Sequence, residues 1–172
     1  SVHIPLTEVI NSITGSGDGI YDIIIRERRL PEATSAIIAG STLAVCGLMM
    51  QTLFHNPLAD PSILGISSGS TLFIAILTFC STALGIGAIV SPLWQIIAAT
   101  AGSMMVLLFL LAVSRRVVSN TSLLITGIMT GYLTSALVSI LQYSGSEDAN
   151  FAFVIWTQGS FSRVVSGELF YI

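Results

Sequence analysis

The chain has no lysine, and charged residues make up only 9% of its 172 residues. All six of its basic side chains are arginines. Without lysine the chain has neither the basic surface of a nucleic-acid-binding protein nor a polybasic tail for anionic lipids. Globular proteins average roughly 25% charged residues. Together with 53% hydrophobic residues and a mean hydropathy of +0.88, this shortage of charge excludes an ordinary soluble domain and predicts a membrane protein.

Side chains of the kind that build catalytic and metal sites are also scarce. Cys46 and Cys80 lie in apolar stretches without CxxC spacing, which argues against a disulfide framework or a thiolate metal site. His3 and His55 are isolated, and the chain has no HExxH motif and no nucleophile elbow. The glycine-rich turn at residues 15–19 lacks the strand-then-helix context of a phosphate loop. We therefore expect no catalytic residue, no metal ligand and no cofactor in this chain.

Long uncharged stretches are the strongest signal that is present. A helix needs about 20 mostly apolar residues to cross the hydrocarbon core of a bilayer. Four such runs lie near residues 33–54, 63–84, 93–113 and 122–143, and a truncated one follows residue 160. Proline is tolerated in the first turn of a helix, so Pro31 predicts the start of the first span. The predicted fold class is an all-α, polytopic transmembrane helix bundle, in a fragment of a longer protein.

The residues ahead of the first run differ in character. Residues 1–29 carry scattered charges, and the apolar pattern near residues 6–13 predicts a short interfacial helix. The sequence thus divides into an extramembrane segment, residues 1–29, and a transmembrane domain, residues 30–172.

Small residues recur at helix spacing inside the spans. Ala36, Gly40 and Ala44 form one stripe in the first run, and Gly102 and Gly127 occur in the third and fourth. Such residues let helix backbones approach closely. We expect the spans to pack against one another as a bundle.

The stretch QTLFHNPLADPSILGISSGS, residues 51–70, links the first two spans. Pro57 and Pro61 restrict the residues before them, Asn56 and Asp60, away from helical geometry, so the helix must break there. Irregular backbone near a bilayer is tolerated where protein or water satisfies its polar groups. Two interpretations stay open on these residues alone, the wall of a water-filled cavity and a plain exposed turn.

Arginines gather at two places along the chain. Arg26, Arg28 and Arg29 stand just ahead of the first span, as an interfacial anchor or a docking patch for an acidic partner. The pair at residues 115–116 follows the third span, so the two groups lie on opposite sides of the membrane. Acidic residues near the first group reduce its net positive charge, so the positive-inside rule does not decide the orientation.

These residues also carry a family resemblance. The motifs are RLPE at residues 29–32, GLMMQ at 47–51, NPLADP at 56–61, LGISSGS at 64–70, SNTSLLITGI at 119–128 and WTQGSF at 156–161. In this order and at uninterrupted spacing they resemble the FecCD-type permeases of ATP-binding-cassette (ABC) importers, membrane subunits that take up ferric siderophores, haem and cobalamin. The resemblance covers nearly the whole chain from Ile25.

The resemblance implies a permease of the type II ABC importer class in the bacterial or archaeal cytoplasmic membrane. It implies as partners a cytoplasmic ABC ATPase dimer, a periplasmic or lipid-anchored substrate-binding protein and a second permease copy or paired subunit. ATP would be hydrolysed by the separate ATPase subunit, so this chain is not expected to be an enzyme. It also implies that residues 26–29 lie on the outer side of the cytoplasmic membrane and that residues 56–61 and 115–121 lie on its cytoplasmic side.

The resemblance further implies roles for individual residues. Arg29 matches the family's arginine that meets a carboxylate of the binding protein, whereas Glu32 departs from the family's second arginine, and Arg26 or Arg28 is expected to substitute. The loops that close the pore on the cytoplasmic side are expected to contain Asn56, Pro57, Leu58, Asp60 and Pro61, together with Asn120 and Thr121. The fourth span would line the translocation path with polar positions that include Thr126, Thr130, Thr134 and Ser139.

Our leading hypothesis is therefore a transport subunit that gates a pore for a bulky metal chelate, an iron-siderophore, haem or cobalamin. An alternative is an ion-coupled secondary transporter that uses residues 56–61 as a discontinuous-helix site. A coupling carboxylate deep within a span would favour that alternative, and none is present, because Asp60 sits at the end of a run. A non-transporting membrane scaffold is a third possibility, which the small-residue stripes alone would allow.

Overall fold

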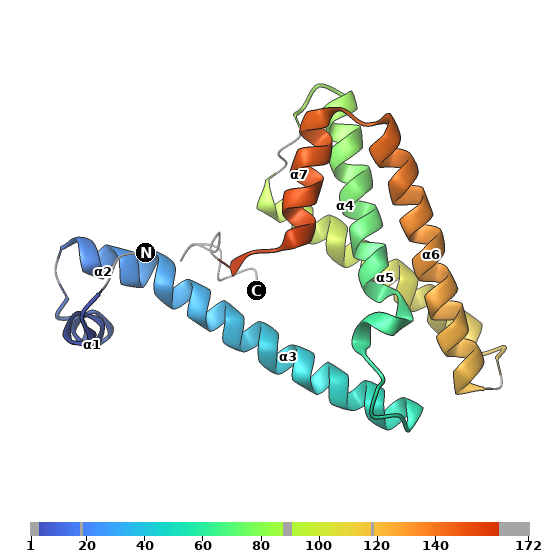
Figure 1. Cartoon of the computed structure of the whole chain (residues 1–172), viewed down its shortest axis with the longest axis horizontal. Coiled ribbons are helices and arrows are strands. Elements are labelled where there is room, and N and C mark those ends of the chain that lie inside the picture. Colours follow the sequence, from blue (N-terminus) through green and yellow to red (C-terminus); the bar gives the residue numbers. More distant parts are fainter. Residues whose placement is uncertain (1–3, 18, 88–90, 118, 162–172) are drawn as a thin grey trace. The chain divides into compact units, whose positions relative to one another are not determined.

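The computed structural model describes residues 4–17, 19–87, 91–117 and 119–161 (Figure 1). Every regular element among these residues is helical, and four helices are long and apolar enough to cross a membrane. The predicted all-α transmembrane fold is thereby confirmed. The chain forms two compact units, one with residues 1–46 and 160–172 and the other with Gly47–Gly159. The truncated span expected after residue 160 lies almost wholly outside the described residues.

The first unit begins with two short helices, α1 (Leu6–Thr14) and α2 (Ile20–Ile24). A π-helical turn, η1 (Ile25–Arg29), then leads into α3 (Leu30–Phe54), so one continuous helix of 35 residues runs from Ile20 to Phe54.

This continuous helix differs from the expectation that the first span starts at Pro31. Proline has no N–H and normally ends or kinks a helix. Here the N–H of Leu30 donates to the carbonyl of Ile25, five residues back, so a wide π turn comes directly before the proline. A π turn is one of the local adjustments by which a helix passes an irregular position without ending.

The second unit contains the end of α3, the short 3₁₀ helix η2 (Pro61–Leu64), α4 (Ile66–Ala83), α5 (Pro92–Ser114), α6 (Asn120–Ser144) and α7 (Glu147–Gln158). Helix α4 contacts α5, α6 and α7 and is the centre of this unit (Figure 1). Its core residues are Ile74, Ala75, Phe79, Val138, Ala149 and Phe153. The rings of Phe79 and Phe153, from α4 and α7, have centroids 5.9 Å apart.

Helix α7 was not expected from the sequence, since its 12 residues are too few to span a membrane. Its start is nevertheless encoded locally. The hydroxyl of Ser146 accepts a hydrogen bond from the N–H of Ala149, and the acidic Glu147 and Asp148 favour a helix N-terminus. Ser119 caps α6 in the same way, through the N–H of Ser122.

Glycines permit the closest helix contacts in the second unit. A Cβ added to Gly69 of α4 would collide with the carbonyl oxygen of Gly102 in α5, and the reverse substitution would collide likewise. A Cβ on Gly127 would lie 2.9 Å from the Cα of Leu64. The expected packing role is confirmed for Gly102 and Gly127. For Gly40, by contrast, no described atom lies within 4 Å of the added Cβ.

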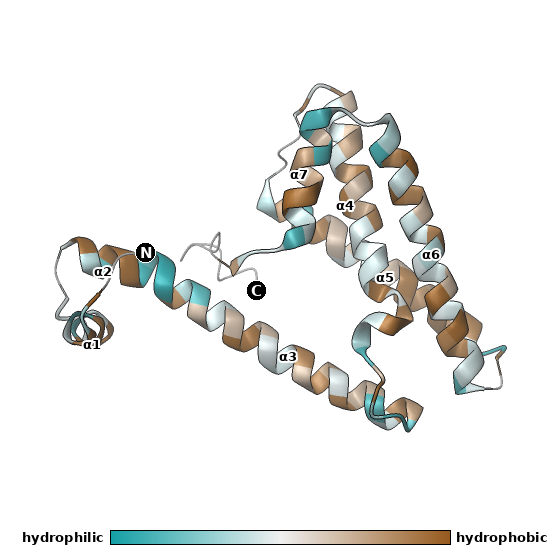
Figure 2. Ribbon diagram, viewed as in Figure 1, coloured by the Kyte–Doolittle hydropathy of each residue, from teal (hydrophilic) through white to brown (hydrophobic). Residues whose placement is uncertain are grey.

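Polar and apolar residues are arranged as a bilayer requires. Hydrophilic residues lie mainly at the ends of the helices and in the segments that join them, whereas the middles of the helices are mostly apolar (Figure 2). Large apolar side chains of α5 and α6, such as Leu108, Leu111, Leu133 and Ile140, are exposed. An apolar outer surface of this extent suits contact with lipid tails.

Candidate functional site

The break between α3 and α4 begins with a left-handed residue. His55 has φ +49°, and its N–H donates to the carbonyl of Thr52 at 3.4 Å. The N–H of Asn56 donates to the carbonyl of Gln51 at 3.2 Å. These two bonds form a Schellman motif, in which a left-handed residue after the helix satisfies its last carbonyls. His55 therefore ends the helix through its backbone, a role that the sequence analysis did not assign.

The turn after His55 is closed by side-chain hydrogen bonds. The Asn56 Oδ1 accepts from the N–H of Leu58 at 2.9 Å, and the Gln51 Nε2 donates to the carbonyl of Pro57 at 3.2 Å. Ala59 is buried, whereas the Leu58 side chain is 83% exposed. The turn thus holds a large apolar side chain outward on a fixed backbone.

Asp60 and Pro61 start the short helix η2. The Asp60 Oδ1 accepts from the N–H of Ser62 at 2.7 Å and also from the hydroxyl of Ser62. These hydrogen bonds lower the pKa of the Asp60 carboxyl below its ordinary value. Pro61 occupies the first turn of η2, where its missing N–H is no loss. The carboxylate therefore shapes the loop.

The second segment expected to close the pore is hydrogen-bonded to the helix that comes just before the first. The Asn120 Nδ2 donates to the carbonyl oxygen of Leu53 at 3.1 Å, which joins the first residue of α6 to the end of α3. Both Asn120 and its neighbour Thr121 are exposed. The sequence did not predict this bond, since Leu53 and Asn120 are 67 positions apart.

The three threonines of α6 that are expected to line the pore bond to their own helix. The hydroxyl of Thr126 donates to the carbonyl of Ser122 at 2.9 Å, and that of Thr130 to the carbonyl of Thr126 at 2.8 Å. Thr134 donates to the carbonyl of Gly131 at 2.8 Å. Thr126 and Thr130 are half-buried, whereas Thr134 is buried and lines a cavity.

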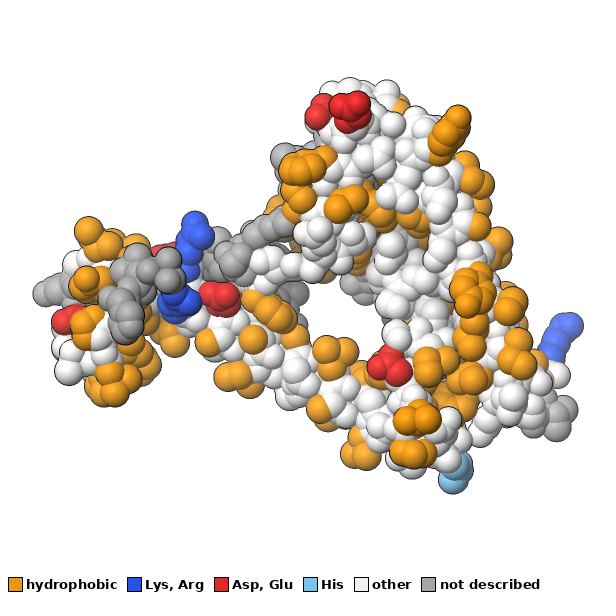
Figure 3. Space-filling model, in the orientation of Figure 1, with side chains coloured by type: hydrophobic (Ala, Val, Ile, Leu, Met, Phe, Trp, Pro, Cys, Tyr) orange, Lys and Arg blue, Asp and Glu red, His pale blue; other side chains and the backbone are white. Residues whose placement is uncertain are grey.

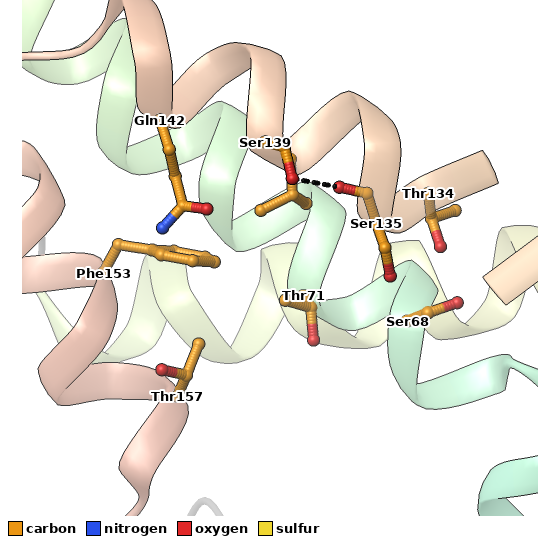
Figure 4. A pocket seen from close by; sticks show the side chains of 9 residues that line it. Ser68, Thr71, Thr134, Ser135, Ser139, Gln142, Phe153 and Thr157 are labelled. Atoms are coloured by element: carbon orange, nitrogen blue, oxygen red, sulfur yellow. Dashed lines mark hydrogen bonds between the residues drawn. The ribbon is translucent and has the colours of Figure 1, made fainter. Parts of the chain in front are cut away.

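This cavity of about 250 Å³ lies between α4, α6 and α7 (Figure 4). Six hydroxyls and one carboxamide line it, together with two apolar side chains: Ser68, Thr71, Thr134, Ser135, Val138, Ser139, Gln142, Phe153 and Thr157. No charged side chain is among them. Such a lining offers hydrogen bonds to neutral groups but cannot balance the charge of an ion.

Two of these residues, Thr134 and Ser139, were expected from the sequence to line the path. The signal for Ser135 and Gln142 was their helix spacing from Ser139, which places all three polar residues on one face of α6. Thr157 comes from α7, a helix that the span pattern did not predict. Its place in the cavity therefore depends on tertiary packing.

The arginines at the start of the long helix have different surroundings. The Arg26 Nε donates to the Asp22 Oδ1 at 2.9 Å, and its Nη2 donates to the carbonyl of Ser12 in α1 at 2.9 Å. Arg28 and Arg29 are exposed on the π turn. Of the three, Arg26 is engaged within the protein, and Arg28 and Arg29 present their charge to the surroundings.

We looked for potential metal ligands in the part of the chain that the structure describes. The His, Cys, Asp and Glu side chains there form no group of three or more that could hold a metal ion. Cys46 and Cys80 are both free thiols.

The four long apolar helices, the broken link between α3 and α4 and the uncharged cavity define a multi-pass membrane protein. The chain belongs to the FecCD transport family, whose family model matches residues 1–172. The resemblance seen in the sequence motifs is thereby confirmed, and the alternative of an ion-coupled secondary transporter gains no support.

Two curated relatives are permeases of a vitamin B12 import system. The chain is 31% identical over 148 residues to the vitamin B12 import system permease protein BtuC of Pectobacterium atrosepticum, an alignment that covers 86% of this chain and 43% of the relative. It is 33% identical over 145 residues to BtuC of Escherichia coli O1:K1 / APEC, covering 83% of this chain and 42% of the relative. The chain thus spans less than half the length of these relatives.

A solved structure has a similar arrangement of helices. It is the inward-facing conformation of a metal-chelate type ABC transporter, with a TM-score of 0.79 and 27% sequence identity. The match covers 96% of this chain and 55% of that one.

Proposed function

We propose that this chain is part of the permease subunit of a binding-protein-dependent ABC importer in a bacterial or archaeal cytoplasmic membrane. Its cargo is a metal chelate of the iron-siderophore, haem or cobalamin kind. The observation that carries this proposal is the family match along all of residues 1–172. The likeness to a metal-chelate type ABC transporter over 96% of the chain supports the same conclusion.

Energy enters through a separate subunit in this proposal. Importers of this class combine permease subunits with a cytoplasmic ATPase dimer and a substrate-binding protein outside the membrane, and a second permease completes the pore. Binding-protein docking and ATP binding then shift the permease between outward-open and inward-open arrangements, because each ligand favours one of them.

The cytoplasmic gate is formed in part by residues 56–61 together with Asn120 and Thr121. The exposed Leu58 supplies an apolar side chain that can block a pore, and the turn bonds of Asn56 hold its backbone in place. The bond from Asn120 to Leu53 supports a shared gate, because it ties the second segment to the base of the first.

The translocation path runs along the polar face of α6. Thr126, Thr130 and Thr134 lie on this helix, and the neighbouring cavity carries six hydroxyls without charge. Pockets for small ligands are usually about 300–1,000 Å³, so a cavity of about 250 Å³ suits one side of a wider path. Weak, uncharged hydrogen-bonding groups let a polar chelate pass without trapping it.

Docking of the binding protein uses the exposed Arg29 and Arg28. Arg26 acts differently, since its guanidinium is held by Asp22 and by the Ser12 carbonyl. Its contribution is to hold the segment that presents the other two arginines.

Transport by reconstituted vesicles tests the proposal. The full permease is purified with the ATPase and binding protein encoded beside it, and uptake of radiolabelled cobalamin, haem and a ferric siderophore is measured. We expect accumulation of one of these chelates that needs both ATP and the binding protein. An ATPase variant without its phosphate-loop lysine serves as the control. Uptake that follows an ion gradient and ignores ATP would overturn the proposal.

A further inference from the structure

Helix α1 exposes an apolar face. Leu6, Ile10 and Ile13 are 74%, 53% and 61% exposed, and their spacing of four and three residues puts them on one side of the helix. Asn11, also exposed, points about 130° away from the middle of that face, at roughly 100° per residue. Hydrophobic side chains gather over this end of the chain in Figure 3.

Helix α1 is fastened to the start of the long helix. The Arg26 Nη2 donates to the carbonyl of Ser12, and the Arg26 Nε is paired with Asp22. Ser12 is buried, and a Cβ on Gly17 would lie 2.8 Å from its Cα, so the turn after α1 packs closely on it. The apolar face is therefore held at a set position beside α2 and η1.

This position is at the edge of a membrane. The helix from Ile20 to Phe54 has 35 residues, which is roughly 52 Å at 1.5 Å per residue. The hydrocarbon core of a bilayer is about 30 Å thick and about 40–45 Å with its headgroup regions. The long helix is thus longer than the bilayer, and its N-terminal end, which carries Asp22 and Arg26 and to which α1 is fastened, suits the headgroup region.

We propose that α1 lies in the membrane–water interface with Leu6, Ile10 and Ile13 inserted among the lipid chains. The charge of the segment indicates how it binds. Among residues 4–17 the only charged side chain is Glu8, so apolar burial drives the contact and anionic lipid adds no attraction. Through Arg26, the lipid contact fixes the height of the π turn above the membrane. This inference stands apart from the transport proposal, since it needs only a spanning helix.

Nitroxide labels on the full permease in lipid nanodiscs test the inference. Cys46→Ser and Cys80→Ser remove the thiols of this chain, and any cysteine elsewhere in the permease is replaced likewise. A label is attached at Ile10→Cys or, as the matched control, at Asn11→Cys. Relaxation by oxygen, which concentrates in lipid, is compared with relaxation by a water-soluble nickel chelate. We expect oxygen to dominate at position 10 and the nickel chelate to dominate at position 11. Raising the salt, or replacing zwitterionic with anionic lipid, should leave both results unchanged.

Other occupants of the apolar face give different results. A label at position 10 that is shielded from both reagents, in nanodiscs and in detergent alike, would mean that protein covers the face. Shielding that appears only when the binding protein is added would identify that protein as the occupant. Nickel access equal to that of the Asn11 control would mean that the face lies in water. Each of these three outcomes overturns the inference, and labels at Leu6→Cys and Ile13→Cys repeat the test.

Discussion

The side-chain amide of Asn120 donates a hydrogen bond of 3.1 Å to the backbone carbonyl of Leu53, 67 positions earlier in the chain. Leu53 lies in the last turn of α3, where helix carbonyls lack partners within the helix. The bond therefore satisfies a free acceptor and joins the last turn of α3, just before the first linking segment, to the first residue of α6, just after the second. If these segments gate a pore, the bond makes them move as one.

Replacing this amide should loosen the shared gate. Asn120→Ala removes a hydrogen bond worth about 0.5–1.5 kcal/mol, so the turn at residues 55–60 should open more often. We expect a thiol at Leu58→Cys to react faster with a bulky reagent in the closed state when Asn120→Ala is also present. Thr121→Ala is the matched control, because it changes an exposed neighbour and keeps the bond. Equal labelling rates in the two backgrounds would show that the bond does not tie the segments together.

His55 should tolerate glycine better than any branched residue. Its φ of +49° suits glycine, whereas a left-handed conformation costs other residues roughly 1–2 kcal/mol. We expect His55→Gly to keep or raise the melting temperature of the purified permease, and His55→Val to lower it. Comparing the two variants separates the effect of the left-handed backbone from the effect of the imidazole side chain. If glycine lowered the melting temperature as much as valine does, the imidazole ring itself would be needed for stability.

The contact between Gly69 and Gly102, where α4 crosses α5, should not tolerate a side chain at either position. Gly69→Ala would push a Cβ against the carbonyl of Gly102, and overpacking of this kind costs typically about 1–3 kcal/mol. We expect a lower melting temperature and poorer membrane insertion for this variant. Gly40→Ala is the control, since its Cβ would meet no described atom within 4 Å. Equal stability of the two variants would contradict the close contact.

Acid should loosen the turn at Asp60. Hydrogen bonds from Ser62 lower the folded pKa of this carboxyl, so its contribution to stability is present above the unfolded value of about 3.9. That contribution is lost as the pH falls through the lower folded value. Hydrogen exchange at the Ser62 amide, corrected for its intrinsic rate, should show protection that falls below about pH 4. Asp60→Asn should show no such pH dependence, and identical profiles for both proteins would be evidence against the cap.

Docking through Arg29 should depend on salt. Exposed charges are screened beyond about 8 Å at physiological ionic strength, so Arg29→Glu should weaken binding-protein affinity most at low salt. Surface plasmon resonance over a range of salt concentrations measures this effect. Arg115→Glu, expected on the other side of the membrane, provides the control. Affinity that is unchanged at every salt concentration would remove Arg29 from the docking surface.

Several features were predictable because they depend on residues close together in the sequence. Runs of apolar residues predict the long helices, since each residue adds its own transfer free energy and backbone bonds close within four residues. The prolines at positions 57 and 61 predict the break between α3 and α4 in the same local way. The motif NPLADP, with its neighbours, was enough to indicate the family that the whole-chain match now shows.

Other features were decided by tertiary structure, because contacts between distant residues outweigh local preference. The π turn carries the first long helix past Pro31, which the sequence alone made its start. Packing of α7 on α4 brings Phe153 against Phe79 and Thr157 into the cavity. The sequence does not separate Arg26 from Arg28 and Arg29, whereas in the structure only Arg26 of the three donates a hydrogen bond to the carbonyl of Ser12. The sequence by itself therefore determined the membrane spans and the family, and the fold decided which polar side chains face the cavity, which hold the loops together and which remain exposed.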